Sequence, residues 1–186
     1  MRSFDNIKIE PAYGIKIIND IKIESKLNEH AIMYLCGIVD ESVNFDSATN
    51  ASFDDEIHIY EAGESNKTIF KGLITSIETK KVNGVYYAEI QAMSGSFRLD
   101  IKKKSRSFQD IDMTYPDLVK GILKDYPRNN FINTICDGVK IGEPILQYKE
   151  TDWELIRRLA SRFNSIIAPD MLDTGTRLCF GLPKGS

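Results

Sequence analysis

The sequence predicts an α+β protein that is mainly β, in which an antiparallel β-barrel is followed by a small α/β domain with two amphipathic helices. Apolar residues alternate with polar ones at a period of two through much of residues 1–100, which is the pattern of strands with one buried face. No helical pattern separates these runs, so antiparallel pairing is favoured. After residue 110 the apolar residues repeat at helical spacing. We therefore expect a β-barrel domain over residues 1–100 and a small α/β domain over residues 101–186.

Six runs in the first hundred residues have the character of strands: 6–10, 15–24, 31–39, 57–59, 69–79 and 85–93. The run 31–39 is apolar at odd and even positions, which predicts a central strand that is covered on both sides. Asn83 and Gly84 separate the last two runs, and this pair favours a type I′ hairpin turn, where φ is positive. The polar segment 40–56 is the longest expected loop.

Two helices are expected in the second domain. The first covers residues 115–126, with Thr114 as its N-cap and Asp117 as the partner of the cap. Gly121 lies inside it at a cost of about 1 kcal/mol relative to alanine, which we interpret as a sign of close packing. A strand pair over residues 165–168 and 177–181 is expected to complete the domain.

The second helix covers residues 151–164. Thr151 and Glu154 have the spacing of a capping box. Glu154 and Arg158 are four residues apart, so we expect an ion pair between them. Trp153 is the single tryptophan, and packing is the favoured role for it, with an interface anchor as the alternative.

Composition and charge exclude several classes of protein. The 186 residues carry a net charge of −3, divided into −6 for residues 1–100 and +3 for residues 101–186. This basic half is too weak to imply specific nucleic-acid binding. No apolar run approaches the roughly 20 residues of a membrane helix, and the N-terminus has no apolar signal core. The three cysteines form no CxxC pair, so we expect free thiols and neither a metal nor another cofactor. Free cysteines are typical of a protein that is made in a reducing cytoplasm.

The sequence contains no recognisable catalytic motif, which favours a structural or binding protein over an enzyme. His30 and His58 are the only histidines and belong to no metal or nucleophile motif. The strongest charged feature is a basic run made of Lys102, Lys103, Lys104 and Arg106. A solvated linker or strand edge is the favoured interpretation of this run, and a protein-binding surface is the functional alternative.

One segment resembles a known family. Residues 147–162 read QYKETDWELIRRLASR, which is similar to the Q-Y-x-E-T/S-D-W/F-x-F/L-x-x-R-L-A signature of phage baseplate hub proteins. This group, the late control protein D family, includes hubs of R-type bacteriocins (tailocins) and the base of type VI secretion spikes. Shorter stretches also resemble the family: NEHA at 28–31, FKGLI at 70–74, SRSFQ at 105–109 and GLP at 181–183.

The resemblance implies a non-enzymatic virion component with a tail-tube-like barrel. Such hubs are trimers that join the tail tube of a contractile injection system to its central spike, with other baseplate proteins around them. The protein is then made in the bacterial cytoplasm and incorporated into a phage-tail-like particle. Family hubs are usually longer, so we expect this chain to be a fragment, or its remaining parts to lie on other chains.

The resemblance also supplies candidate interface residues, which lie in the signature segment. The arginines among them are expected to pair across a subunit boundary. The candidates are Gln147, Tyr148, Thr151, Asp152, Trp153, Glu154, Arg157, Arg158, Leu159 and Arg162.

Two other functions remain open from the sequence. One is a carbohydrate-binding or cell-wall-binding β-module of a phage-type particle, which needs an exposed aromatic platform; Tyr13, Phe45, Phe53 and Tyr60 are the candidates. The other is a hydrolase domain with a pair of carboxylates. Binding to glycans distinguishes the first from a hub, and turnover of cell walls distinguishes the second.

Overall fold

The computed structural model describes residues 4, 6–41 and 55–182, and its chain divides into two compact units. The sheet unit consists of Met1–Ser25, Ala31–Ser94 and Met171–Thr174. The α/β unit consists of Lys26–His30, Gly95–Asp170 and Gly175–Ser186. Each unit therefore includes a short segment that lies, along the chain, within the other.

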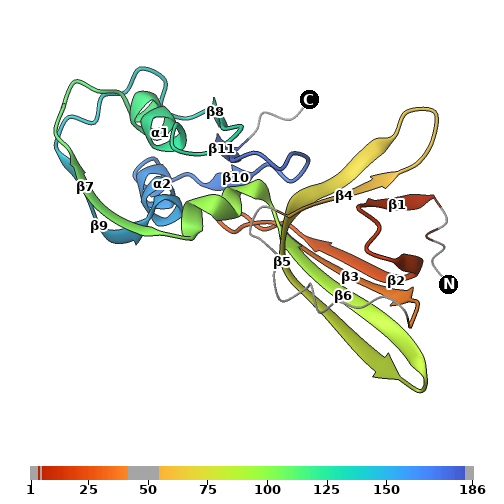
Figure 1. The fold of residues 1–186 in the computed structure, drawn as a ribbon. Helices are drawn as coiled ribbons and strands as arrows, with labels where there is room; N and C mark the ends of the chain where they lie inside the picture. The colour runs from red at the N-terminus through yellow and green to blue at the C-terminus, as the bar shows by residue number, and fades with distance from the viewer. Residues whose placement is uncertain (1–3, 5, 42–54, 183–186) are drawn as a thin grey trace. The chain divides into compact units, whose positions relative to one another are not determined.

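The described residues of the sheet unit form a curled sheet of six antiparallel strands, ordered β1-β4-β5-β6-β3-β2 (Figure 1). It forms a half-barrel with β1 and β2 at its edges. This confirms the predicted mainly-β α+β class. The strands are β1 (Ile7–Glu10), β2 (Ile15–Glu24), β3 (Ile32–Val39), β4 (Glu56–Glu61), β5 (Lys67–Val82) and β6 (Val85–Met93).

The core of this unit lies on one face of the sheet. On β3, Met33 and Leu35 are buried, whereas Tyr34 between them is 40% exposed. The prediction that this strand is covered on both sides is therefore wrong. Tyr34 lies opposite Lys22 on β2 and Gln91 on β6, so the second face is shared with polar neighbours that keep it partly hydrated.

The hairpin between β5 and β6 has the predicted turn. Asn83 and Gly84 have φ values of 51° and 83°, and a type I′ turn requires positive φ at both central residues. Val82 pairs directly with Val85 across it. The turn thus sets the register of the longest hairpin in the unit.

Gly72 on β5 lies where a side chain has no space. A Cβ atom on Gly72 would lie 2.6 Å from two ring carbons of Phe70 and closer still to the carbonyl oxygen of Met93. We expect Gly72→Ala to lower the free energy of unfolding by about 1–3 kcal/mol because the buried strand is overpacked. Urea denaturation followed by circular dichroism measures this loss. Gly63→Ala is the control, since a Cβ there has no neighbour within 4 Å; an equal loss in both variants would contradict the prediction.

Within the described residues, the α/β unit has two α-helices, one 3-10 helix and two small sheets. The 3-10 helix η2 (Gly95–Asp100) leads to β7 (Lys103–Phe108), which pairs with β9 (Ile145–Thr151) in an antiparallel ribbon. The second sheet has the order β10-β11-β8, and β11 is antiparallel to β10 but parallel to β8. The remaining elements are α1 (Tyr115–Leu123), α2 (Asp152–Ser161), β8 (Asn130–Asn133), β10 (Ile167–Pro169) and β11 (Arg177–Phe180).

Both helices begin as predicted and end earlier. The Thr114 hydroxyl accepts a hydrogen bond from the Asp117 backbone N–H at 3.2 Å, and α1 ends at Leu123 instead of residue 126. The capping box of Thr151 and Glu154 is present, with N–H···O distances of 2.8 and 3.1 Å, and α2 ends at Ser161. The predicted strand pair near the C-terminus is confirmed as β10 and β11.

The packing interpretation of Gly121 is wrong. Gly121 is exposed on α1, and a Cβ there would meet nothing within 4 Å. We therefore expect Gly121→Ala to raise the free energy of unfolding by about 0.5–1 kcal/mol, because alanine restricts the unfolded chain and favours the helix. A lower urea midpoint in this variant would show that Gly121 has a structural role.

The three cysteines are free, as predicted: Cys136 and Cys179 are buried, and Cys36 is partly buried. Among the helices in the described ranges, none has the length and apolar character needed to cross a membrane.

Candidate functional site

The signature segment is built around the carboxylate of Asp152, which is completely buried at the start of α2. Its Oδ2 accepts hydrogen bonds from Tyr126 Oη at 2.6 Å and Lys104 Nζ at 2.7 Å. Its Oδ1 accepts them from Gln147 Nε2 at 2.9 Å and from the Arg106 guanidinium. Both oxygens thus have two donors each, which is what a buried carboxylate needs to remain charged.

The β7–β9 ribbon positions three of these donors. Lys104 and Arg106 are two residues apart on β7, so they project from the same face of the strand. Arg106 pairs in register with Gln147 on β9, and its Nε donates to Gln147 Oε1 at 2.6 Å. The chain then enters α2 directly at Asp152, where the helix dipole favours a negative charge.

Two opposing effects act on the pKa of Asp152. Burial raises the pKa, and hydrogen bonds from Lys104, Tyr126 and Gln147, together with the charge of Arg106, lower it by more. The net result is a pKa below the usual value for aspartate. The pKa of Tyr126 moves well above its usual value, through burial and its hydrogen bond to Asp152, so this phenol remains a donor.

Trp153, the next residue of α2, is 3% exposed and packs against His30. The two rings have centroids 4.1 Å apart with an interplanar angle of 37°, and Phe97 meets His30 edge-on at 5.8 Å. The predicted packing role of Trp153 thus has a defined partner. His30 itself lies just before β3.

Ser96, His30 and Asp100 lie in the order of a hydrolase triad. His30 Nδ1 is 2.9 Å from Ser96 Oγ, and Nε2 is 3.5 Å from Asp100 Oδ2. A nucleophilic serine must reach its substrate, but Ser96 is completely buried. Asp100 also accepts a hydrogen bond from the Thr151 hydroxyl, so this cluster joins η2 to the start of α2.

His30 makes stability depend on pH. Burial lowers the pKa of His30 and outweighs the opposing effect of Asp100, so the folded protein favours the neutral ring, whereas the unfolded chain takes up a proton near pH 6.5. Stability is therefore present above pH 6.5 and lost as the pH falls below it.

We expect urea midpoints to fall from pH 7.5 to pH 5.5 in the wild type and to fall less in His30→Gln. His58→Gln is the comparison: burial also lowers the pKa of His58, but its side chain is 26% exposed against 11% for His30, so we expect a smaller change in the pH dependence than for His30→Gln. An identical pH dependence in His30→Gln and wild type would contradict the assignment.

Asn28, in the NEHA stretch, pairs with β10. Its backbone N–H donates to the Ile167 carbonyl, and its side-chain Oδ1 accepts from the Ile167 N–H, both at 2.9 Å. The positive φ of 64° at Asn28 is a conformation that asparagine tolerates better than most residues. Asn28 thus has a structural role, which is to pair with the distant strand β10.

The signature arginines divide into paired and unpaired side chains. Arg158 binds Glu150 through its Nε and Nη2 and also donates to the Leu146 carbonyl at 2.8 Å. The predicted Glu154–Arg158 pair is wrong, because Glu154 is used by the capping box. Arg162 contacts Tyr115 Oη at 3.0 Å and Glu143 Oε1 at 3.1 Å. Arg157 is exposed and makes no ion pair within the described ranges.

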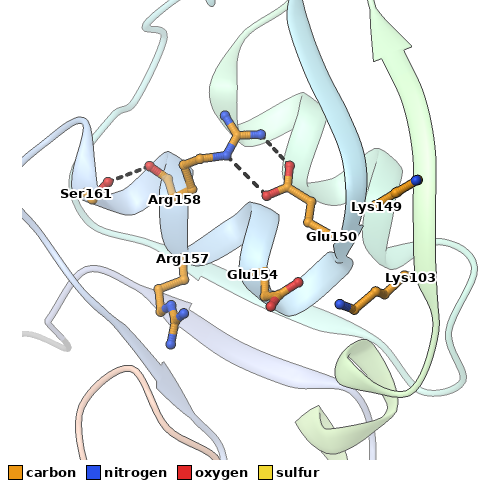
Figure 2. Close-up of a pocket in the computed structure, with 7 residues that line it drawn as sticks. All are labelled: Lys103, Lys149, Glu150, Glu154, Arg157, Arg158 and Ser161. Atoms are coloured by element: carbon orange, nitrogen blue, oxygen red, sulfur yellow. Dashed lines mark hydrogen bonds and ion pairs between the residues drawn. The ribbon is translucent and has the colours of Figure 1, made fainter.

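A pocket of about 460 Å³ lies beside α2 and the β7–β9 ribbon, and Figure 2 shows the side chains around it. Arg158 and Glu150 face each other, whereas Arg157 and Lys149 point away from that pair in different directions. The charged groups of the pocket are therefore spread over a surface and do not converge on one point. The lining residues are Lys103, Lys149, Glu150, Glu154, Arg157, Arg158 and Ser161.

Comparison with known proteins identifies the family. The model of the phage tail baseplate hub (GPD) family matches residues 29–163, which include β3–β6 and the whole Asp152 cluster. The chain belongs to the phage tail baseplate hub family. No curated protein matches it.

Solved structures share the hub fold at low sequence identity. A tail protein from Neisseria meningitidis has a TM-score of 0.65 at 11% identity, covering 94% of this chain and 49% of its own. The E. coli protein c3393, described as a type VI secretion component similar to T4 tail proteins gp27 and gp5, has a TM-score of 0.60 at 15% identity, covering 93% and 48%. A 43 kDa prophage tail protein from Shewanella oneidensis has a TM-score of 0.59 at 13% identity, and the match covers 86% of this chain and 47% of that protein. The chain thus spans about half the length of these proteins.

Within this hub domain, the structure divides the sequence candidates by environment. Gln147, Thr151, Asp152, Trp153 and Leu159 are buried. In the basic run, Lys104 and Arg106 bind Asp152, while Lys102 and Lys103 are exposed. Tyr148 is 64% exposed. The exposed side chains of this set, which another molecule can reach, include Lys102, Lys103, Tyr148 and Arg157.

Sequence reasoning missed Tyr126 as a donor to Asp152, and Asp100 as a partner of Thr151 and His30. Tyr126 contributes to the apolar helical pattern, which hides its hydroxyl, and Asp100 lies in a segment without periodicity. The sequence does contain one signal for the strand: Lys104, Arg106 and Phe108 alternate on one side of it. This pattern is hard to recognise because two of the three inward side chains are charged.

The aromatic platform needed for a glycan-binding module is not assembled by the described candidates. Tyr60 donates a hydrogen bond to Glu10 at 2.8 Å, and its ring lies 4.8 Å from that of His58. Tyr13 is partly buried and packs against the sheet core. Phe45 and Phe53 lie outside the described residues.

Proposed function

We propose that this protein is a structural hub component, without catalytic activity, that joins the tail tube of a contractile injection system to its central spike as part of a homotrimeric ring. The observation that carries the proposal is the family match over residues 29–163. The particle that contains the protein will show whether the injection system is a phage tail, a tailocin or a secretion-type injector.

The arrangement of the signature residues supports a structural role. Asp152 and its donors are held inside the α/β unit by side chains from β7, β9 and the segment after α1. This network fixes the start of α2 and the ribbon beside it, so the surface around them is preorganised. A preorganised surface lowers the ordering cost of binding protein partners.

The test is to find the protein in assembled particles. A tagged chain is expressed in cells that make the complete particle without the native copy, and the tag is located by gold labelling in electron micrographs. The proposal expects labels at the junction of tube and spike, with three copies per particle by quantitative mass spectrometry. Label along the tube shaft, on fibres, or absent from the particles would overturn it.

A glycan array tests the alternative on the same preparation. Saturable binding to cell-wall glycans, with no incorporation at the junction, would replace the hub assignment by a cell-wall-binding module. Absence of binding together with label at the junction would support the hub.

A further inference from the structure

The pocket beside α2 has more positive than negative charge. Lys103, Lys149, Arg157 and Arg158 line it with Glu150 and Glu154. Both carboxylates are engaged inside the unit, one by Arg158 and the other by the Thr151 N–H. Lys103, Lys149 and Arg157 form no ion pair within the part of the chain that the structure describes. We call these three residues the cationic rim.

An exposed apolar pair adjoins this rim. Leu146 and Tyr148 on β9 are 62% and 64% exposed. The ammonium of Lys149 lies 5.3 Å from the centroid of the Tyr148 ring, and the Leu146 carbonyl binds Arg158. Tyrosine and arginine are enriched among the residues that dominate protein interfaces, and the exposed Leu146 beside them adds apolar surface. A small anion does not explain the apolar pair, whereas a protein surface does.

The chain itself carries a complementary surface. The sheet unit has 8 Lys/Arg and 15 Asp/Glu, a net charge of −7, whereas the α/β unit has 16 and 12, a net charge of +4. Glu61, the last residue of β4, and Glu64, in the turn after it, are exposed and form no ion pair among the described residues. Such opposite charges steer two copies toward each other and disfavour contacts between like units.

Cyclic rings of more than two subunits use two different patches that meet head to tail. We propose that the cationic rim with Leu146 and Tyr148 docks the acidic sheet unit of a second copy of this chain, near Glu61 and Glu64. This contact deepens the trimer assignment and rests on that part of the proposed function. The distribution of the rim, with Arg157 and Lys149 pointing in different directions (Figure 2), fits an extended partner surface.

Zero-length cross-linking tests the contact directly. Equal amounts of ¹⁴N- and ¹⁵N-labelled full chain are mixed, treated with a carbodiimide, which joins amines to carboxylates, and analysed by mass spectrometry. The proposal expects mixed-isotope cross-links from Lys103 or Lys149 to acidic residues of the sheet unit, Glu61 and Glu64 foremost. Mixed-isotope links confined to other lysines, or links only within one copy, would overturn it.

A charge reversal measures the strength of the contact. Sedimentation at 50 mM and 500 mM salt is expected to show at least tenfold weaker self-association for Arg157→Glu than for wild type at low salt, and a smaller difference at high salt. Lys124→Glu is the matched control, since Lys124 is an exposed cation after α1 in the same unit. Circular dichroism confirms that each variant is folded.

The outcomes separate the contact from the wider function. A trimer that Arg157→Glu leaves unchanged would overturn the proposed contact and leave the hub role intact. A wild-type chain that is monomeric at every concentration and salt would overturn the contact between copies, and labelling of particles would still decide the hub role. Equal weakening by Arg157→Glu and Lys124→Glu would show a general effect of charge, which also overturns the proposed site.

Discussion

Replacing Asp152 with alanine is expected to lower the free energy of unfolding by about 3 kcal/mol. The substitution leaves Lys104, Arg106 and Gln147 without the acceptor that they share. Removing one partner of a buried ion pair costs about 3–5 kcal/mol, and the lower end applies because the side chains of Lys104 and Arg106 are about a quarter exposed and can regain water. Urea denaturation at pH 7 measures the loss.

Asp125 offers a control that touches the same cations. It lies 3.4 Å from Lys104 Nζ and 3.7 Å from Arg106 Nη1, but its side chain is 58% exposed. We expect Asp125→Ala to cost less than about 1 kcal/mol, as exposed pairs do. Similar losses in the two variants would show that burial of Asp152 does not determine its contribution.

Acid should remove the contribution of Asp152. Its pKa is lowered in the folded protein, so its stabilising effect is present above the unfolded value, near pH 3.9, and is lost as the pH falls through the folded value. Asp152→Asn keeps the size of the side chain but does not titrate. Its urea midpoint should therefore fall less than that of the wild type between pH 5 and pH 3, and equal slopes would contradict this assignment.

Replacing Trp153 with alanine is expected to cost about 3–5 kcal/mol, the range for a large aromatic side chain deleted from a core. Trp153 is 3% exposed and stacked on His30, so the deletion also removes an aromatic contact worth about 0.5–1.5 kcal/mol. Circular dichroism must follow unfolding, because the variant has lost the only tryptophan.

Tyr148→Ala is the matched control for Trp153. Both are large aromatic residues of the signature segment, but Tyr148 is 64% exposed. We expect its free energy of unfolding to change by less than about 0.5 kcal/mol, while its self-association weakens if the cationic rim and its apolar pair form the contact. A loss below about 1 kcal/mol for Trp153→Ala would remove the packing role.

Much of the local structure could be predicted because local rules determine it. The I′ turn at Asn83 and Gly84 follows from positive φ, and the start of α2 follows from the capping box of Thr151 and Glu154. The end of each helix was less predictable, since no C-capping glycine follows either one; Lys124 and Arg162 occupy the C-cap positions. Burial of both faces of β3 was wrongly predicted because apolar composition does not show which neighbours share a face.

The candidate site could be predicted only as a segment. The signature identifies Gln147, Asp152 and Trp153 by resemblance, but gives no means of separating core residues from surface ones. Arg157 and Arg158 are adjacent in sequence and differ in environment, since Arg158 binds Glu150 whereas Arg157 has no ion-pair partner in the described part of the chain. A helix turns by about 100° per residue, so neighbours on it face different surroundings.

By itself the sequence determined the family, the mainly-β class, the turn at Asn83 and the helix starts, because these depend on motifs and on interactions between residues a few positions apart. The tertiary structure alone decided that Lys104 and Arg106 face the buried Asp152, that His30 stacks on Trp153, and that Arg157 and Lys103 find no ion-pair partner among the residues the structure describes. These contacts join residues 46 to 123 positions apart. Only the folded chain brings such residues together, and the low dielectric inside it then gives a buried charge its effect.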